Sequence, residues 1–153
     1  MKKHGTFLVP TLLVADAIYQ NAVKSPETLP PTVAKKAVAL AATMIGNADR
    51  AYKAGVKIAL GTDQAASSGR NKAEEFALLV KAGLTPIDAI FTSTKNAAAL
   101  IGTPEDIGTV QAGRYADIVG VEGDPLADIT VLQRVDLVMK GGEVFKSGGR
   151  MIK

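Results

Sequence analysis

The sequence predicts an α/β protein in which alternating strands and helices are followed by a small antiparallel β module. Short apolar runs alternate with stretches of helical periodicity up to about residue 102. Beyond that point, closely spaced glycines divide the chain into short β runs. We therefore expect two parts, residues 1–105 and residues 106–153.

The first part begins with an apolar run at residues 6–10, which is typical of a strand buried on both faces. Proline has no N–H to donate, so Pro10 can stand only at the end of this strand. Residues 12–23 fit either a short helix or a loop. The strongest helical pattern covers residues 32–54, where apolar residues recur three and four positions apart and Gly55 provides the stop.

A second strand is predicted at residues 56–63, and its last residue is Asp63. A glycine-rich loop, residues 64–70, separates this strand from the next helix. Asn71 is the expected N-cap of that helix because Glu74 stands three positions later, as in a capping box. The apolar face of the helix comprises Phe76, Leu79 and Val80.

Two further helices and the β module complete the pattern. Pro86 starts one helix at the position that proline favours, and a second helix covers residues 95–101 before Gly102. The β module consists of three predicted strands, at residues 117–121, 135–140 and 143–146. Gly141 and Gly142 form the two-residue hairpin between the last two strands.

Length and composition exclude several classes of protein. At 153 residues the chain has room for one domain but not for a complete (β/α)8 barrel, which needs about 250 residues. Without cysteine there are no disulfides or thiolates, and one histidine excludes a metal site built from several histidines of this chain. The net charge of +3 is thinly spread and aromatic residues are only 5%, so we expect no nucleic-acid partner. No apolar stretch approaches the roughly 20 residues that cross a bilayer, so we expect no membrane partner.

The N-terminal segment admits two interpretations. Two lysines, an apolar run and small residues around Asp16 are similar to a secretory signal peptide. However, Pro10 interrupts the apolar run, and an aspartate is unfavourable at a cleavage site. A buried strand followed by a helix is the preferred interpretation, with a cytoplasmic location expected and secretion as the alternative.

Asp63 is the candidate functional residue. It ends a strand of the parallel type, and ligands and catalytic groups gather at the carboxyl ends of such strands. A carboxylate there can ligate a metal or accept a proton from an attacking water. The alternative is structural, with Asp63 capping the backbone N–H groups of the loop that follows. By contrast, we expect His4 to be an exposed histidine and the carboxylates of residues 122–128 to form a turn and a cap.

Three segments carry a resemblance to a known family. The first, residues 6–12, reads Thr-Phe-Leu-Val-Pro-Thr-Leu. The second comprises residues 55–63, 75–76 and 82–86, and the third comprises residues 108–110, 113–119, 124–126 and 138–144. In this order they resemble the C-terminal third of the amidohydrolase superfamily, closest to its imidazolonepropionase-related and Xaa-Pro dipeptidase-like branch.

The resemblance implies that residues 1–105 are strands seven and eight, with their helices, of a (β/α)8 barrel. Residues 106–153 would then be the C-terminal strands of a composite β-sandwich domain. It also implies a hydrolase of carbon–nitrogen bonds, in which metal-activated water attacks an amide of a small molecule or peptide. Asp63 matches the family's aspartate on the eighth strand, which ligates the metal, expected to be zinc, and takes the proton of the water.

The histidines and the lysine that hold the metal in that family stand on earlier strands, which this sequence does not contain. Catalytic zinc sites normally use three protein ligands, so we expect no tight metal binding by this chain alone. One hypothesis is therefore an amidohydrolase fragment that is inactive, or needs the remainder of the barrel. The alternative is a non-catalytic α/β module that self-associates, because open strand edges pair with other chains.

Overall fold

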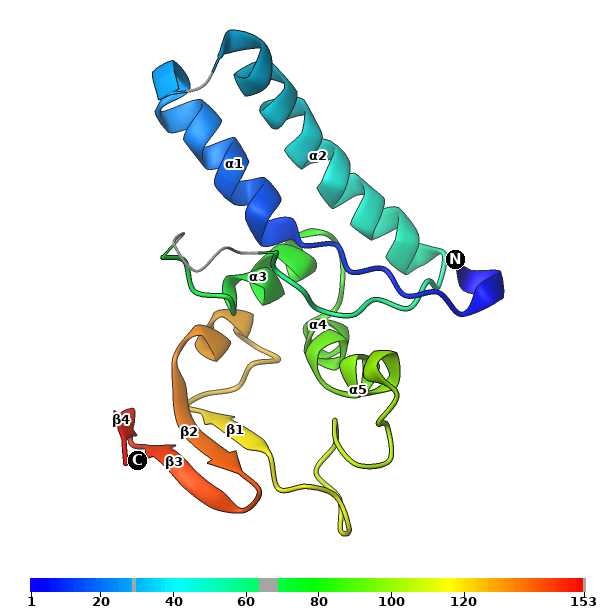
Figure 1. Cartoon of the computed structure of the whole chain (residues 1–153), viewed down its shortest axis with the longest axis vertical. Coiled ribbons are helices and arrows are strands. Elements are labelled where there is room, and N and C mark those ends of the chain that lie inside the picture. Colours follow the sequence, from blue (N-terminus) through cyan, green and yellow to red (C-terminus); the bar gives the residue numbers. More distant parts are fainter. Residues whose placement is uncertain (29, 64–68, 153) are drawn as a thin grey trace.

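The computed structural model describes residues 1–28, 30–63 and 69–152, which form a helical part and a small sheet (Figure 1). The α-helices are α1 (Leu12–Lys24), α2 (Pro31–Lys53), α3 (Glu74–Lys81), α4 (Pro86–Ser93) and α5 (Lys95–Ile101). The strands are β1 (Ile118–Val121), β2 (Val135–Lys140), β3 (Glu143–Ser147) and β4 (Arg150–Met151). Short 3-10 helices are η1 (Lys2–His4), η2 (Pro26–Thr28) and η4 (Ile129–Gln133). The α/β class and the antiparallel sheet agree with the prediction.

The two predicted N-terminal strands meet in a single parallel bridge, between Leu8 and Ile58. The Leu8 N–H donates to the Lys57 carbonyl at 2.8 Å, and the Ala59 N–H donates to the Leu8 carbonyl at 3.0 Å. The next bond of this ladder would need an N–H at residue 10, which Pro10 lacks. The expected strands are therefore extended segments that share one bridge.

The segment that the sequence leaves ambiguous, residues 12–23, is the helix α1. It packs beside α2, and the two helices form a hairpin that extends away from the rest of the molecule (Figure 1). At its base, Leu12 and Leu13 are about 1% exposed. Burial of this end in the main core therefore favours the helix over the loop. The buried members of that core are Leu12, Leu13, Ala48, Ile58, Leu78, Leu79, Ala82, Leu84 and Ala89.

The caps of the later helices follow the sequence signals closely. Helix α3 begins at Glu74, later than predicted. The capping contacts of Asn71 are present nonetheless: the Glu74 carboxylate accepts the Asn71 N–H at 3.1 Å, and the Asn71 side chain accepts the Ala73 N–H at 3.0 Å. Helix α4 begins at Pro86, and α5 has the predicted bounds. The Thr85 hydroxyl accepts the Asp88 N–H at 3.2 Å, which caps α4.

The sheet has the order β1-β2-β3-β4, with antiparallel neighbours. Gly141 and Gly142 join β2 to β3 with positive φ values of 58° and 83°, as the hairpin requires. The turn and cap predicted at residues 122–128 are confirmed, because Asp124 accepts the Leu126 N–H and Asp128 accepts the Thr130 N–H, each at 2.9 Å. Strand β4 was not predicted. No helix within the described ranges is both long and apolar enough to cross a membrane.

Candidate functional site

Asp63 lies at the carboxyl end of residues 56–63, with its side chain exposed. The neighbouring segment, residues 6–10, runs parallel to it and ends next to Thr11. Parallel segments bring their carboxyl ends to the same edge, so Thr11 and Asp63 belong to one edge of the pair. The loop residues that Asp63 would cap in the structural alternative, residues 64–68, lie outside the described part of the chain.

Both of these residues have a left-handed backbone. In the described ranges, Thr11, with φ 49°, and Asp63, with φ 45°, are the non-glycine residues of positive φ. A β-branched residue such as threonine is a rare occupant of this region, and such strain costs about 1–3 kcal/mol. Strained backbone is found preferentially at functional sites, and here it stands at the end of each of two adjacent segments.

Gly61 allows these two ends to approach closely. A Cβ atom added to Gly61 would stand 2.5 Å from Cγ1 of Val9 and 3.8 Å from Cγ2 of Thr11. The first distance is far shorter than a normal carbon–carbon contact. The backbone just before Asp63 therefore lies close against the Val9 side chain, which would have to move if residue 61 carried a Cβ.

Glu75 caps the helix that begins directly after Thr11. Its side chain is fully buried, and its two carboxylate oxygens accept the N–H groups of Leu12 at 2.8 Å and Leu13 at 2.7 Å. These N–H groups belong to the first turn of α1, whose N-cap residue, Thr11, makes no capping hydrogen bond with its own side chain. Burial raises the pKa of the Glu75 carboxyl, and the two N–H donors oppose that rise.

Hydrogen bonds from the following helices fix residues 56–63 on the opposite side. The Leu60 N–H donates to the carbonyl of Thr92, a residue only 1% exposed, at 3.0 Å. The Asn96 side-chain amide donates to the Ile58 carbonyl at 2.9 Å. The segment that carries Asp63 is thus held from both sides.

An ion-pair cluster joins α1 to the start of α3. The Arg70 guanidinium contacts the Asp16 carboxylate at 2.8 Å and also pairs with Glu74. Each of these three side chains is less than 30% exposed. The cluster ties the chain after residues 64–68 to the helix that follows Thr11.

Asp63 is a candidate on sequence grounds, whereas the capping role of Glu75 is not predictable from the sequence. Glu75 is part of the second resembling segment, but nothing local shows that a side chain in α3 caps a residue 62 positions earlier. The available signal was an acidic residue next to the apolar face of a helix. His4, in the exposed helix η1, takes no part in this edge, as expected.

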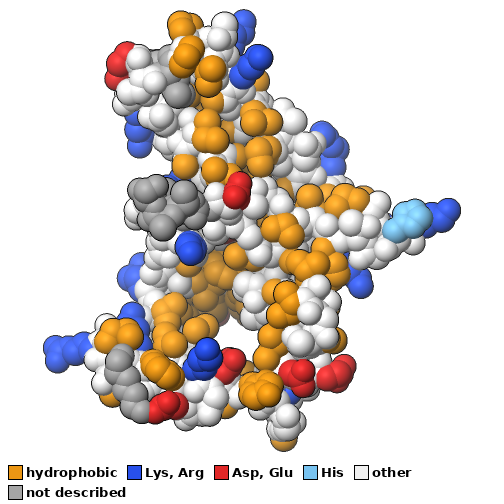
Figure 2. Space-filling view, in the orientation of Figure 1, with side chains coloured by type: hydrophobic (Ala, Val, Ile, Leu, Met, Phe, Trp, Pro, Cys, Tyr) orange, Lys and Arg blue, Asp and Glu red, His pale blue; other side chains and the backbone are white. Residues whose placement is uncertain are grey.

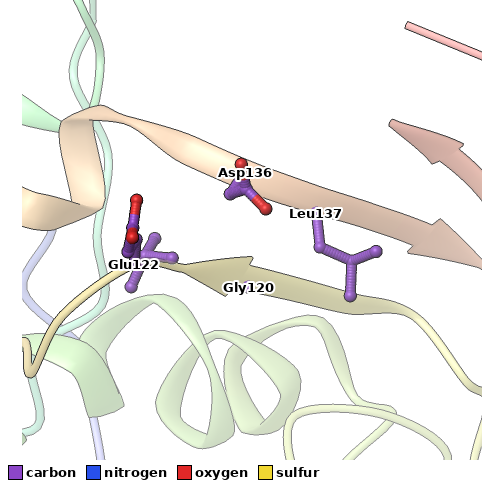
Figure 3. A pocket seen from close by; sticks show the side chains of 5 residues that line it. Gly120, Glu122, Asp136 and Leu137 are labelled. Carbon is purple, nitrogen blue, oxygen red and sulfur yellow. The ribbon is translucent and has the colours of Figure 1, made fainter. Parts of the chain in front are cut away.

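The described residues do not by themselves fit a metal ion. Nowhere in the described ranges do three or more His, Cys, Asp or Glu side chains gather closely enough to hold one. A hollow beside the sheet is lined by Glu122, which directly follows β1, and by Asp136 of β2 (Figure 3). Two carboxylates are fewer donors than a structural or catalytic metal site normally uses. Among the described residues, Asp63 is the one that we predict as a ligand of the metal.

Comparison with known proteins identifies the family of this chain. The profile of the amidohydrolase family matches residues 1–145. Ochratoxinase of Aspergillus niger is 35% identical over 153 residues, covering 97% of this chain and 31% of that protein. Imidazolonepropionase of Shouchella clausii is 33% identical over 113 residues, covering 70% of this chain and 25% of that protein.

Solved structures agree with the sequence comparisons. A Xaa-Pro dipeptidase with methionine bound in its active site superposes with a TM-score of 0.87 at 31% identity, covering 96% of this chain and 36% of that one. The A. niger ochratoxinase structure gives a TM-score of 0.82 at 36% identity, covering 96% of this chain and 33% of that one. The chain thus spans about a third of the length of these TIM-barrel relatives, in their C-terminal portion. It belongs to the amidohydrolase family.

Proposed function

We propose that this chain supplies Asp63 and the last two β/α units to an amidohydrolase that cleaves carbon–nitrogen bonds. The observation that carries the proposal is the placement of Asp63. Its exposed carboxylate stands at the carboxyl end of a segment paired in parallel, beside the matching end at Thr11. Catalytic groups of (β/α)8 barrels stand at this end of their strands.

The Asp63 carboxylate would act as a general base. An exposed carboxylate at this edge can accept a proton from the water that attacks the amide carbonyl. Amidohydrolases are generally metal-dependent, and the chemistry that a bound zinc supplies is a lowered pKa of water. The remaining ligands would come from the rest of the barrel, since the described part of this chain gathers no group of three ligating side chains.

The substrate class follows from the relatives. They include a Xaa-Pro dipeptidase and an ochratoxinase, and the names describe hydrolases of a peptide and of a small molecule. We therefore propose an amide bond in a small molecule or a short peptide as the substrate of the complete protein. Xaa-Pro dipeptides are the first substrates to test.

The exposed apolar surface supports completion by further chain. Figure 2 shows a hollow lined by hydrophobic side chains between the sheet and the helical part. The exposed apolar residues from the end of α5 to β1 include Ile101, Val110, Tyr115 and Val119, which are 65%, 82%, 67% and 64% exposed. Exposed apolar surface of this kind usually marks an interface. In the proposed assembly, the remainder of the barrel and of the β-sandwich covers it.

The test is reconstitution. The chain is co-expressed with the preceding portion of A. niger ochratoxinase, and the purified complex is assayed with zinc against Met-Pro and other Xaa-Pro dipeptides and against ochratoxin. We expect amide hydrolysis by the complex and none by either part alone. Asp63→Asn should abolish this activity, because an amide cannot accept the proton.

Asp106→Asn is the matched control, since Asp106 is an exposed aspartate on the loop after α5. It should retain the activity of the unaltered complex. A complex that assembles and shows no hydrolysis of these substrates contradicts the proposed function. Activity that survives Asp63→Asn shows instead that Asp63 is not the base.

The alternative function is a non-catalytic module that self-associates. The observation that favours it is the same exposed apolar surface, which a second copy of the chain could cover. Light scattering of the purified chain distinguishes the two. If the chain forms a stable, inactive oligomer that does not exchange for the complementary barrel portion, the alternative stands.

A further inference from the structure

Glu75 is a fully buried carboxylate that the proposed chemistry does not use. Burying a charged carboxylate is costly unless its oxygens are satisfied. Here each oxygen accepts one N–H, from Leu12 at 2.8 Å and Leu13 at 2.7 Å. Because Glu75 has no contact with solvent, we look for its function in the two N–H groups that it binds.

What it holds is the first turn of α1, directly after the strained residue Thr11. Threonine is normally a good N-cap, and its hydroxyl then bonds to the N–H groups of the first turn. In this chain Glu75 occupies those N–H groups, and Thr11 takes a left-handed backbone with φ 49° and ψ 49° instead. Two charge-assisted hydrogen bonds are of sufficient strength to offset strain of this size.

Thr11 in turn borders the segment that ends in Asp63. A Cβ atom added at Gly61 would lie 3.8 Å from Cγ2 of Thr11, so the Thr11 side chain stands beside the space next to the Gly61 backbone. Asp63 stands two residues further on, with its own left-handed backbone. The Glu75 carboxylate, the first turn of α1, Thr11 and the backbone before Asp63 thus follow one another as neighbours in the fold.

We propose that Glu75 is a positioning residue for Asp63, acting through the first turn of α1 and the left-handed Thr11. The inference rests on the proposed function for its catalytic consequence. Its structural part, the dependence of the backbone at residues 11 and 63 on the Glu75 carboxylate, stands independently of any activity.

The first experiment measures backbone NMR chemical shifts of the full chain, in which Glu75→Gln replaces one acceptor oxygen by an amide that cannot accept. We expect the signals of Leu12 and Leu13 to move, and those of Thr11 and Asp63 to lose the shifts typical of positive φ. Adding Thr11→Gly to Glu75→Gln should restore the Asp63 signals, because glycine adopts this backbone without strain.

Thr85→Ala is the matched control, because it also removes a helix cap, that of α4. It should lower stability without moving the Thr11 or Asp63 signals. If Glu75→Gln does not fold, Glu75→Asp takes its place, since it keeps the carboxylate but shortens its reach. A variant whose Leu12 and Leu13 signals move while those of Thr11 and Asp63 stay overturns the proposal.

The second experiment uses the reconstituted complex. Glu75→Gln should lower kcat about tenfold or more and leave KM within about twofold, because a misplaced base slows the chemical step and leaves substrate binding intact. The Thr85→Ala complex, compared at equal folded fraction, should keep its kcat. Equal losses in both complexes would show that Glu75 serves stability only. An inactive unaltered complex would contradict the proposed function and leave the NMR result to decide the structural part.

Discussion

At the scale of single residues, two carboxylates respond to pH in opposite senses. The hydroxyls of Thr85 and Tyr52 donate to the Asp88 carboxylate, each at 2.6 Å, and lower its pKa below the usual 3.8. Burial raises the pKa of Glu75 above 4.5. Asp88 therefore contributes stability above pH 3.8 that is lost as the pH falls through its folded-state pKa. Glu75 contributes stability below pH 4.5 that is lost as the pH rises through its own.

Replacing Asp88 should weaken the loss of stability at acid pH. We expect Asp88→Asn to lower the free energy of unfolding at pH 5 and to flatten its decline below about pH 3.8, because the amide does not titrate. Urea unfolding followed by circular dichroism between pH 5 and pH 2.5 measures both effects. Asp106→Asn should show the same decline as the unaltered chain. An undiminished decline in Asp88→Asn would contradict the assignment.

At the scale of elements, the parallel pair combines two hydrogen bonds with a close contact at Gly61. One bridge joins residues 6–10 to residues 56–63, whereas Gly61 packs directly against Val9. A methyl group added at Gly61 must displace the Val9 side chain or the backbone that follows it.

Gly61→Ala should therefore destabilise the chain by about 1–3 kcal/mol, as overpacked sites typically do. Val9→Ala removes the colliding methyl, so the double variant should be less destabilised than the sum of the two single variants. Denaturant unfolding of the four proteins measures this coupling. Additive losses would show that the contact between residues 9 and 61 is not the cause.

Elements with local signals were predictable from the sequence, and those fixed by distant contacts were not. The start of α4 follows from Thr85 and Pro86, and the β2–β3 hairpin from two glycines. The N-cap residue of helix α1 makes no capping bond with its own side chain, and Glu75 caps the helix instead. The local sequence of residues 12–23 is therefore compatible with either a helix or a loop. The same holds for the candidate site. The position of Asp63 at the end of a predicted strand indicates it from the sequence, whereas only the folded chain shows that Glu75 caps the helix after Thr11.

At the scale of the whole molecule, the chain spans about a third of the length of its relatives. No described group of three ligating side chains surrounds Asp63. The helical part nonetheless has a core of its own, which includes Leu12, Leu79 and Ala89. Folding of this part is therefore separate from assembly of the catalytic centre that we propose.

The purified chain should hold well under one equivalent of zinc, because one carboxylate does not bind it tightly. Elemental analysis after dialysis against metal-free buffer measures the content, and the reconstituted complex is the positive control. Stoichiometric, tightly held zinc in the chain alone would contradict the idea that the other ligands lie elsewhere.

The buried cap on α1 also has a consequence for how the chain folds. The Glu75 carboxylate lies 63 and 62 residues along the chain from its two partners, Leu12 and Leu13. It therefore reaches α1 only when the intervening chain, which includes α2, closes into a loop. Helix α1 gains its cap at the moment when α3 docks, and not before. The hairpin and α3 thus form one cooperative unit, in which an early intermediate with α1 complete and α3 unfolded is disfavoured.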